Sequence, residues 1–343
     1  MALRSEKLKK DAISMIGAGK LQPSDIQLVV SLLQSGDVEP RQCAILSYGR
    51  GMDHLAIEHM VPLLEELALH GADGLWAVLD IISMILHGGK EPSKPLIAVP
   101  RNVLVDPALF ENVPGAMGGH HLEVLVKLLS RNDLFDRGFA RALVKQLLSI
   151  CARSRADIFH ELAGPVSAAL RALMDSHPQE VWAGVARLLR ANDWRVRHRL
   201  ETLIALRHAD HLGPGLLYGL PANLYQKWAR KDPARRAPIV VDWLPIATRA
   251  EDGSLCWHPA LQDFIAEFGN QPGVLSALSV RFLPHFSWGS LVPQLEPLVK
   301  LLNSWSAHSR AEVRQWVSDE VNRIRAEVRD ERRRDDEALI RFS

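Results

Sequence analysis

A short sequence pattern occurs twice in this chain of 343 residues and constrains the local structure at both places. An acidic or polar residue precedes a Val-Arg pair, once at Val196-Arg197 and again at Val313-Arg314. Apolar residues then follow at spacings of three and four, which places their side chains on one face of an α-helix. The two copies therefore predict two amphipathic helices that begin in the same way and bury one face each.

Helical patterns of the same kind fill most of the chain and are separated by short stretches that contain Gly or Pro. No run alternates strictly between apolar and polar residues, so we expect no strand and an all-α fold. Pro245 lies inside a helical pattern and is expected to end or kink that helix. We expect helices over residues 4–17, 23–35, 40–48, 54–69, 73–87, 120–130, 135–153, 157–174, 179–190, 194–209, 221–230, 236–249, 258–268, 271–281 and 290–304, and from 309 onward.

Composition shifts divide the chain into four parts. Residues 88–119 are rich in Gly and Pro, which predicts an irregular loop with one short helix near 106–111. From Arg325 to Glu337 the sequence is nearly all charged, which is typical of the polar cap of a helical stack or of a free tail. The expected organisation is N-terminal helical repeats over 1–87, the loop over 88–119, helical repeats over 120–308, and a capping helix with a charged tail over 309–343.

The Val-Arg patterns resemble the start of the inner helix in HEAT-repeat proteins. Val196 and Val313 stand three periods of about 39 residues apart, and this period suits a two-helix HEAT or armadillo repeat. The resemblance implies a right-handed superhelical stack of antiparallel helix pairs, in which each repeat contacts only its neighbours.

The C-terminal third resembles the closing helical region of large bacterial HEAT-like proteins, some of which are associated with antiviral defence. The resemblance covers about a hundred residues and implies a recognition or scaffolding end-piece. The NTPase or effector domains that such proteins carry upstream are missing from this sequence. The segments that carry the resemblance are Trp257-His258-Pro259, Phe264 to Asn270, Val274 to Leu278, Phe286 to Pro293, and Glu312 to Trp316.

Charge and cysteine content narrow the class of partner and the compartment. The 41 basic and 40 acidic residues give the chain no overall cationic field for nucleic acid, although local patches remain open. Three scattered cysteines argue against a disulfide framework and favour a reducing compartment. The first residues lack a signal-peptide core, and the most apolar stretch, 75–86, is too short to span a bilayer. We therefore expect a cytoplasmic protein with no membrane contact.

Motifs for catalysis are weak in this sequence. Gly115-Ala-Met-Gly118-Gly119 and Gly49-Arg50-Gly51 lack the Gly-Lys-Ser/Thr ending of a phosphate-binding loop. His208 and His211 have a spacing that metal ligands can use, but no third ligand accompanies them, and histidine is also common in a last helical turn. His120-His121 offers a similar pair after a flexible stretch. We expect a non-enzymatic protein without a cofactor or metal; a metal-dependent hydrolase is the weakest alternative.

Basic and aromatic clusters are the stronger functional candidates, because aromatic and arginine side chains dominate protein interfaces. Two Arg/Lys clusters lie at 187–199 and 227–236, and a special loop is expected at 286–293. Arg197 has an alternative role, pairing with an acid of the adjacent repeat. Most of the nine tryptophans are expected in the core. The candidate partner-binding residues are Arg190, Trp194, Arg195, Arg199, Trp228, Arg230, Lys231, Arg235, Arg236, Phe286 and Trp288.

These observations favour a scaffold, adaptor or sensor module that binds a protein partner, plausibly in a bacterial antiviral defence assembly. The alternative is a nucleic-acid-binding solenoid whose Arg/Lys clusters follow the phosphate backbone while aromatic side chains stack on bases. The oligomeric state is left open by the sequence.

Overall fold

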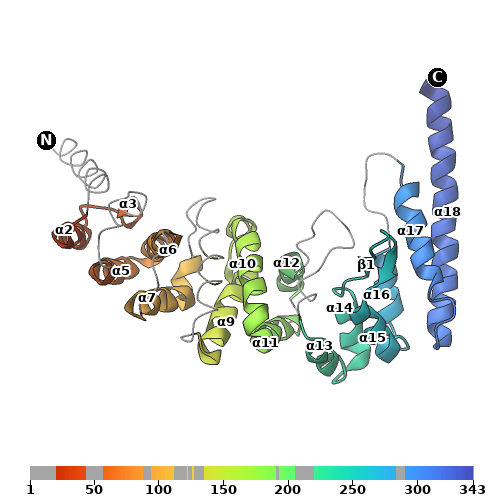
Figure 1. The fold of residues 1–343 in the computed structure, drawn as a ribbon, viewed down its shortest axis with the longest axis horizontal. Coiled ribbons are helices and arrows are strands. Elements are labelled where there is room, and N and C mark those ends of the chain that lie inside the picture. The colour runs from red at the N-terminus through yellow and green to blue at the C-terminus, as the bar shows by residue number, and fades with distance from the viewer. Residues whose placement is uncertain are drawn as a thin grey trace. The chain divides into compact units, whose positions relative to one another are not determined.

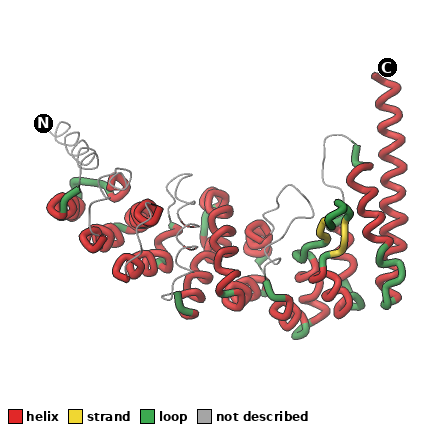
Figure 2. Tube along the Cα trace, viewed as in Figure 1, coloured by secondary structure: helices red, strands yellow, loops and turns green. Residues whose placement is uncertain are grey.

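A computed structural model describes residues 21–43, 57–87, 94–111, 122, 126, 135–190, 193–204, 220–282 and 290–342. These residues are mostly helical, with a single pair of short strands, so the expected all-α class is confirmed at that level (Figures 1 and 2). The chain divides into two compact units, Met1–Leu203 and Ile204–Ser343. This border falls inside the segment 120–308, which the sequence predicted to be one run of repeats.

The first unit consists of helices whose contacts follow a regular order. The helices α2, α5, α7, α9 and α11 contact one another in succession, while α10 packs against both α9 and α11, and α6 packs against α3, α5 and α7. The elements are α2 (Pro23–Gln34), α3 (Pro40–Cys43), η2 (Ile57–Met60), α5 (Val61–Ala68), α6 (Gly71–His87), α7 (Lys94–Val105), η3 (Pro107–Phe110), α9 (Arg137–Arg153), α10 (Ala156–Ser176), α11 (Pro178–Leu189) and α12 (Trp194–Ile204).

The helices α9 and α11 are neighbours that run in the same direction. Arg137 at the start of α9 pairs with Glu180 near the start of α11. Further along both helices, a Cβ on Gly184 would lie 2.6 Å from Cγ1 of Val144 and 2.8 Å from Cδ1 of Leu148. The absence of a side chain at Gly184 therefore lets the two helices approach closely, and the contacts advance along both in parallel.

The second unit contains α13 (Ala222–Ala229), α14 (Pro233–Val241), β1 (Ala247–Arg249), β2 (Leu255–Trp257), α15 (Pro259–Phe268), α16 (Val274–Val280), α17 (Val292–Asn303) and α18 (Ala311–Phe342). In this unit α14 packs against α13, α15 and α16, and α17 lies along α18 (Figure 1). Those last two helices are antiparallel, because the amide before α17 at Leu291 meets Glu331 while Trp305 after α17 meets Trp316.

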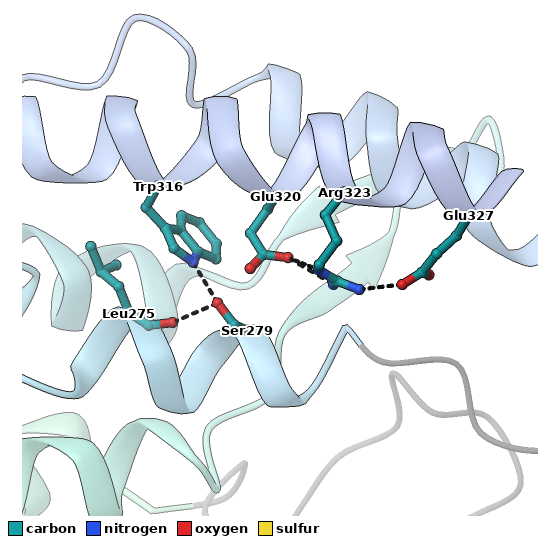
Figure 3. Close-up of polar contacts among 6 residues, drawn as sticks. All are labelled: Leu275, Ser279, Trp316, Glu320, Arg323 and Glu327. Carbon is teal, nitrogen blue, oxygen red and sulfur yellow. Dashed lines mark hydrogen bonds and ion pairs between the residues drawn. The ribbon is translucent and has the colours of Figure 1, made fainter. Parts of the chain in front are cut away.

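The predicted capping helix corresponds to α18, which carries an apolar stripe and a row of charges. Val313, Val317 and Ile324 are almost fully buried. On the same helix Arg323 bridges Glu320 and Glu327, and Nε1 of Trp316 donates to Ser279 of α16 (Figure 3). The charged side chains of Glu320, Arg323 and Glu327 therefore form a partly buried row along α18 in which each is paired with another.

The expectation that the chain has no strand was wrong at residues 247–257. A helix was predicted to run from 236 to 249, but α14 ends at Val241, before Pro245, as that proline predicted. The strands β1 and β2 pair antiparallel, with Ala247 opposite Trp257. Gly253 turns the chain between them with φ of +79°, a conformation that glycine adopts readily. Strands of three residues are too short to produce an alternating pattern.

The expected loop over 88–119 was wrong at residues 94–105, which form α7. Pro95 lies in the first turn, where no backbone N–H is needed, so it is compatible with the helix. Val99, Val103 and Leu104 supply a buried face. The short helix expected near 106–111 is confirmed as η3, where Asp106 accepts from the amide of Ala108.

Several expectations lie outside the described residues. These are the helices at 4–17 and most of 120–130, the second half of 40–48, residues 205–209 of the predicted 194–209 helix, and the special loop at 286–289.

Polar contacts between elements have a consistent range in sequence. Many side-chain hydrogen bonds between described residues join positions 32 to 48 apart. Gln34 and Glu66 are 32 positions apart, and Arg199 and Cys151 are 48 apart. Each element is therefore tied to the next comparable element along the chain.

Candidate partner-binding surfaces

One tryptophan in the described part of the chain is on the surface. Trp194 begins α12 with 72% of its surface exposed, whereas Trp182, four residues into α11, is only 5% exposed. The guanidinium carbon of Arg195 lies 5.7 Å from the Trp194 ring centroid, and Arg190 at the end of α11 is also exposed. We call Arg190, Trp194 and Arg195 the Trp194 patch.

The local sequence explains how Trp194 comes to be exposed. Asp193 caps α12, because its Oδ1 accepts from the amides of Arg195 at 2.8 Å and Val196 at 3.4 Å. With the helix start fixed in this way, Val196 and Leu200 point to the core, and the first residue lies on the opposite side. The apolar spacing that identifies the helix therefore also sets the exposure of Trp194.

Arg199 occupies a different environment from the rest of its cluster. It is half-buried, and its Nη1 donates to the carbonyl oxygens of Ser154 at 2.8 Å and Cys151 at 3.3 Å, at the end of α9. Its guanidinium also lies 5.2 Å from the ring centroid of Phe159. These contacts give Arg199 a role in holding α12 to α9 and α10.

Arg197 pairs within its own helix. Its Nε lies 3.2 Å from Oε1 of Glu201, four residues further along α12. The predicted alternative, a pair with an acid of the adjacent repeat, is therefore not the one observed in this structure. The equivalent arginine of the second pattern, Arg314, donates instead to the carbonyls of His308 and Ser309, ahead of α18.

In the second predicted Arg/Lys cluster, at 227–236, some of the side chains make contacts within the protein. Trp228 is 9% exposed, and Arg236 stacks on it at 4.9 Å and donates to its carbonyl oxygen. Arg230 forms a two-pronged ion pair with Glu267 of α15, and this pairing raises the pKa of the guanidinium. Lys227, Lys231 and Arg235 are exposed. This leaves three accessible cations outside these contacts, where the sequence suggested a continuous basic and aromatic surface.

The two clusters lie in different units, since 187–199 belongs to the first unit and 227–236 to the second. Phe286 and Trp288 fall outside the described residues.

Sequence reasoning missed a set of cations on α9. Arg137, Arg141 and Lys145 are spaced by four residues, and the helix contains no acidic residue. All three are exposed, although Arg137 pairs with Glu180. The spacing of four was the available signal, because it places the three side chains on one side of a helix.

Titratable groups in the described residues do not gather into a metal site. No group of three His, Cys, Asp or Glu side chains within this part of the chain has ligand geometry. His120, His121, His208 and His211 lie outside it. Burial raises the pKa of the Cys43 and Cys151 thiols to about 12 and that of Asp80, on α6, to about 6.

None of the described helices is both long and apolar enough to cross a bilayer.

The chain has few detectable similarities to known proteins. No family profile matches the sequence, and no curated protein matches it. One similar solved structure is an engineered protein described as structural-genomics target OR497, with 12% sequence identity, coverage of 93% of this chain and 95% of that chain, and a TM-score of 0.22. A similarity at this level carries no argument about fold or function.

Proposed function

We propose that this chain is a helical-repeat scaffold that binds a protein partner through the Trp194 patch. The proposed architecture is a HEAT-like stack of helix pairs. Two features support it: the ordered contacts of α2, α5, α7, α9 and α11, and the many side-chain hydrogen bonds that join residues 32 to 48 positions apart. In a repeat protein each unit contacts its neighbours, so contacts concentrate near one repeat length. The period of about 39 residues inferred from the Val-Arg patterns lies in this range.

The exposure of Trp194 is the observation that carries the proposal. The described residues include eight tryptophans, of which seven are at most 9% exposed and Trp194 is 72% exposed. A tryptophan is costly to leave in water, since burying an aromatic side chain removes about 150–250 Å² from solvent. Tryptophan and arginine are also the residue types most enriched among the residues that dominate binding energy. The contact of the Arg195 guanidinium with Trp194, four residues after the exposed Arg190, therefore suits a partner interface.

A protein partner fits the accessible side chains better than nucleic acid does. Of the cations in the two predicted clusters, Arg199, Arg230 and Arg236 are held by internal contacts. Trp228, the aromatic residue that was expected to stack on bases, is buried under Arg236. By resemblance to the bacterial HEAT-like proteins, we extend the proposal to a cytoplasmic adaptor in an antiviral defence assembly. The three free cysteines are compatible with a reducing compartment.

The experiment is a pull-down from the native host with three baits: the unaltered chain, Trp194→Ala and Arg171→Glu. Arg171 is exposed on α10 in the same unit, outside the patch, and is the matched control. The proposal predicts a stoichiometric protein that the unaltered chain and Arg171→Glu retain and that Trp194→Ala loses. Equal recovery with all three baits, or no stoichiometric protein with any of them, contradicts it.

A further inference from the structure

The outer sides of α9 and α11 form a continuous basic surface in the first unit. On α9 the exposed positions include Arg141, Ala142 and Lys145; on α11 they include Ala183 and Arg187. Because the two helices run parallel and touch at Gly184, these side chains belong to one face. We call it the α9–α11 face. Arg190 of the Trp194 patch continues it at the end of α11.

The charge of this face is one-sided. Helix α9 carries Arg137, Arg141, Lys145 and Arg153; α11 and the residue that ends it add Arg187 and Arg190. Within these helices the single acid, Glu180, is buried and paired with Arg137, and the exposed Asp136 that caps α9 pairs with Arg101. Helices α10 and α12 differ from α9 and α11, because together they carry four arginines and an equal number of acids. These acids are Asp157, Glu161, Asp175 and Glu201.

Helix stability does not explain these cations. Arg137 lies in the first turn of α9, where the helix dipole favours negative charge, and its ion pair with Glu180 offsets this cost, whereas Arg141 and Lys145 lie beyond that turn. Lys145 and Arg141 are four apart, a spacing at which like charges repel by a few tenths of a kcal/mol. Both are exposed. A complementary anionic partner would offset these costs.

We propose that the α9–α11 face binds an acidic segment of the partner protein whose other contact is the Trp194 patch. Arg141, Lys145 and Arg187 are exposed on these two adjacent helices, so their charges can act together on an anionic segment. The exposed positions of α9 and α11 include no aromatic side chain for stacking on single-stranded bases, and binding of nucleic acid through its phosphates is the competing outcome of the test. This proposal rests on the proposed function and specifies the chemistry of its partner.

The test measures fluorescence anisotropy of three labelled probes with the whole chain. The probes are a 20-residue peptide of Glu and Ala, a peptide of the same length of Lys and Ala, and a 20-base single-stranded DNA. The variants are Arg141→Glu with Lys145→Glu, and Arg187→Glu with Arg190→Glu; Arg171→Glu on α10, a single charge reversal away from this face, is the control. Circular dichroism verifies that each variant keeps the helical content and melting temperature of the unaltered chain.

We expect saturable binding of the Glu/Ala peptide at low salt, weakening as salt is added, and no binding of the Lys/Ala peptide. Each double reversal is expected to weaken binding at least tenfold, with little change for Arg171→Glu. Absence of saturable binding, or equal loss in Arg171→Glu, overturns the proposal. Tighter binding of the DNA than of the acidic peptide at 150 mM salt also overturns it and favours nucleic acid. If the anisotropy test fails but the pull-down yields a partner that Trp194→Ala loses, the proposed scaffold function stands. Only the claim that the partner binds through an acidic segment is then rejected.

Discussion

The side chain of Arg199 reaches from α12 to the end of α9, where its Nη1 donates a hydrogen bond of 2.8 Å to the carbonyl oxygen of Ser154. This bond joins two helices whose residues are 45 positions apart, close to one repeat length. A comparable contact occurs in the second unit, where the guanidinium of Arg310 donates to the carbonyl of Ala266 at the end of α15. Arginines that satisfy the last carbonyls of an earlier helix are thus a common way of joining neighbours in both units.

Replacing Arg199 should therefore reduce stability. We expect Arg199→Ala to lower the free energy of unfolding by about 1–3 kcal/mol, because two half-buried carbonyls lose a charged donor and Phe159 loses its stacked cation. Urea denaturation provides the measurement. Arg195→Ala is the control, since Arg195 is exposed and should leave stability nearly unchanged. Equal effects in the two variants would show that the contact of Arg199 with α9 is not a stabilising one.

Two glycines should differ in how far they tolerate added side chains. At Gly184 a larger side chain meets Val144 and Leu148 of α9, so Gly184→Val is expected to cost about 1–3 kcal/mol of stability. At Gly164, inside α10, a Cβ would meet nothing within 4 Å except its chain neighbours, but Pro165 follows directly. The proline ring crowds a Cβ on the preceding helical residue and offsets the helix-propensity gain of about 0.5–1 kcal/mol, so Gly164→Ala should change stability little. Thermal or urea unfolding checks both, and a stable Gly184→Val variant would be inconsistent with close packing of α9 on α11.

The hydrogen bond from Nε1 of Trp316 to Oγ of Ser279 joins α18 to α16 at 2.8 Å (Figure 3). We expect Ser279→Ala to cost about 1–3 kcal/mol, because the indole N–H of the 8% exposed Trp316 would lose its partner. Unfolding followed by tryptophan fluorescence measures this. Ser318→Ala, at an exposed position on α18, is the control. A loss of stability in Ser318→Ala as large as in Ser279→Ala would argue against the hydrogen bond as the cause.

Asp80 should make the first unit less stable as the pH rises. Burial raises the pKa of its carboxyl in the folded chain from the ordinary 3.8 to about 6. Between these two values the folded state holds a proton that the unfolded state has released, so stability falls as pH rises from about 4 to about 6. Asp80→Asn cannot ionise. We therefore expect this variant to gain stability relative to the unaltered chain at pH 7 and to gain little at pH 4, as measured by urea denaturation. A gain of the same size at both pH values would contradict the raised pKa.

Helix positions were predictable because apolar residues at spacings of three and four leave a clear pattern, as for α9 and α12. The hairpin β1–β2 was not, since three-residue strands contain too few alternations, and α7 was obscured because Pro95 and Pro100 suggested a loop. Pro95 in the first turn is compatible with a helix, and burial of Val99, Val103 and Leu104 stabilises α7 against the loop that the prolines suggested.

The candidate surface was only partly predictable for a related reason. Trp194 and Trp228 look alike in sequence, each close to arginines, yet one is 72% exposed and the other 9%. Exposure depends on the angle of a side chain about its helix relative to the core and on what neighbouring helices cover. The pairing of Arg230 with Glu267, 37 residues away, likewise depends on packing that no local pattern reveals.

The affinity of the purified partner for Trp194→Ala tests the central claim most directly. The claim predicts a dissociation constant raised at least about 30-fold, which corresponds to a loss of roughly 2 kcal/mol, with an unchanged melting temperature because the side chain is 72% exposed. Trp182→Ala, in the 5% exposed neighbour, should instead lower the melting temperature. An unchanged dissociation constant for Trp194→Ala would contradict the claim that this patch binds the partner.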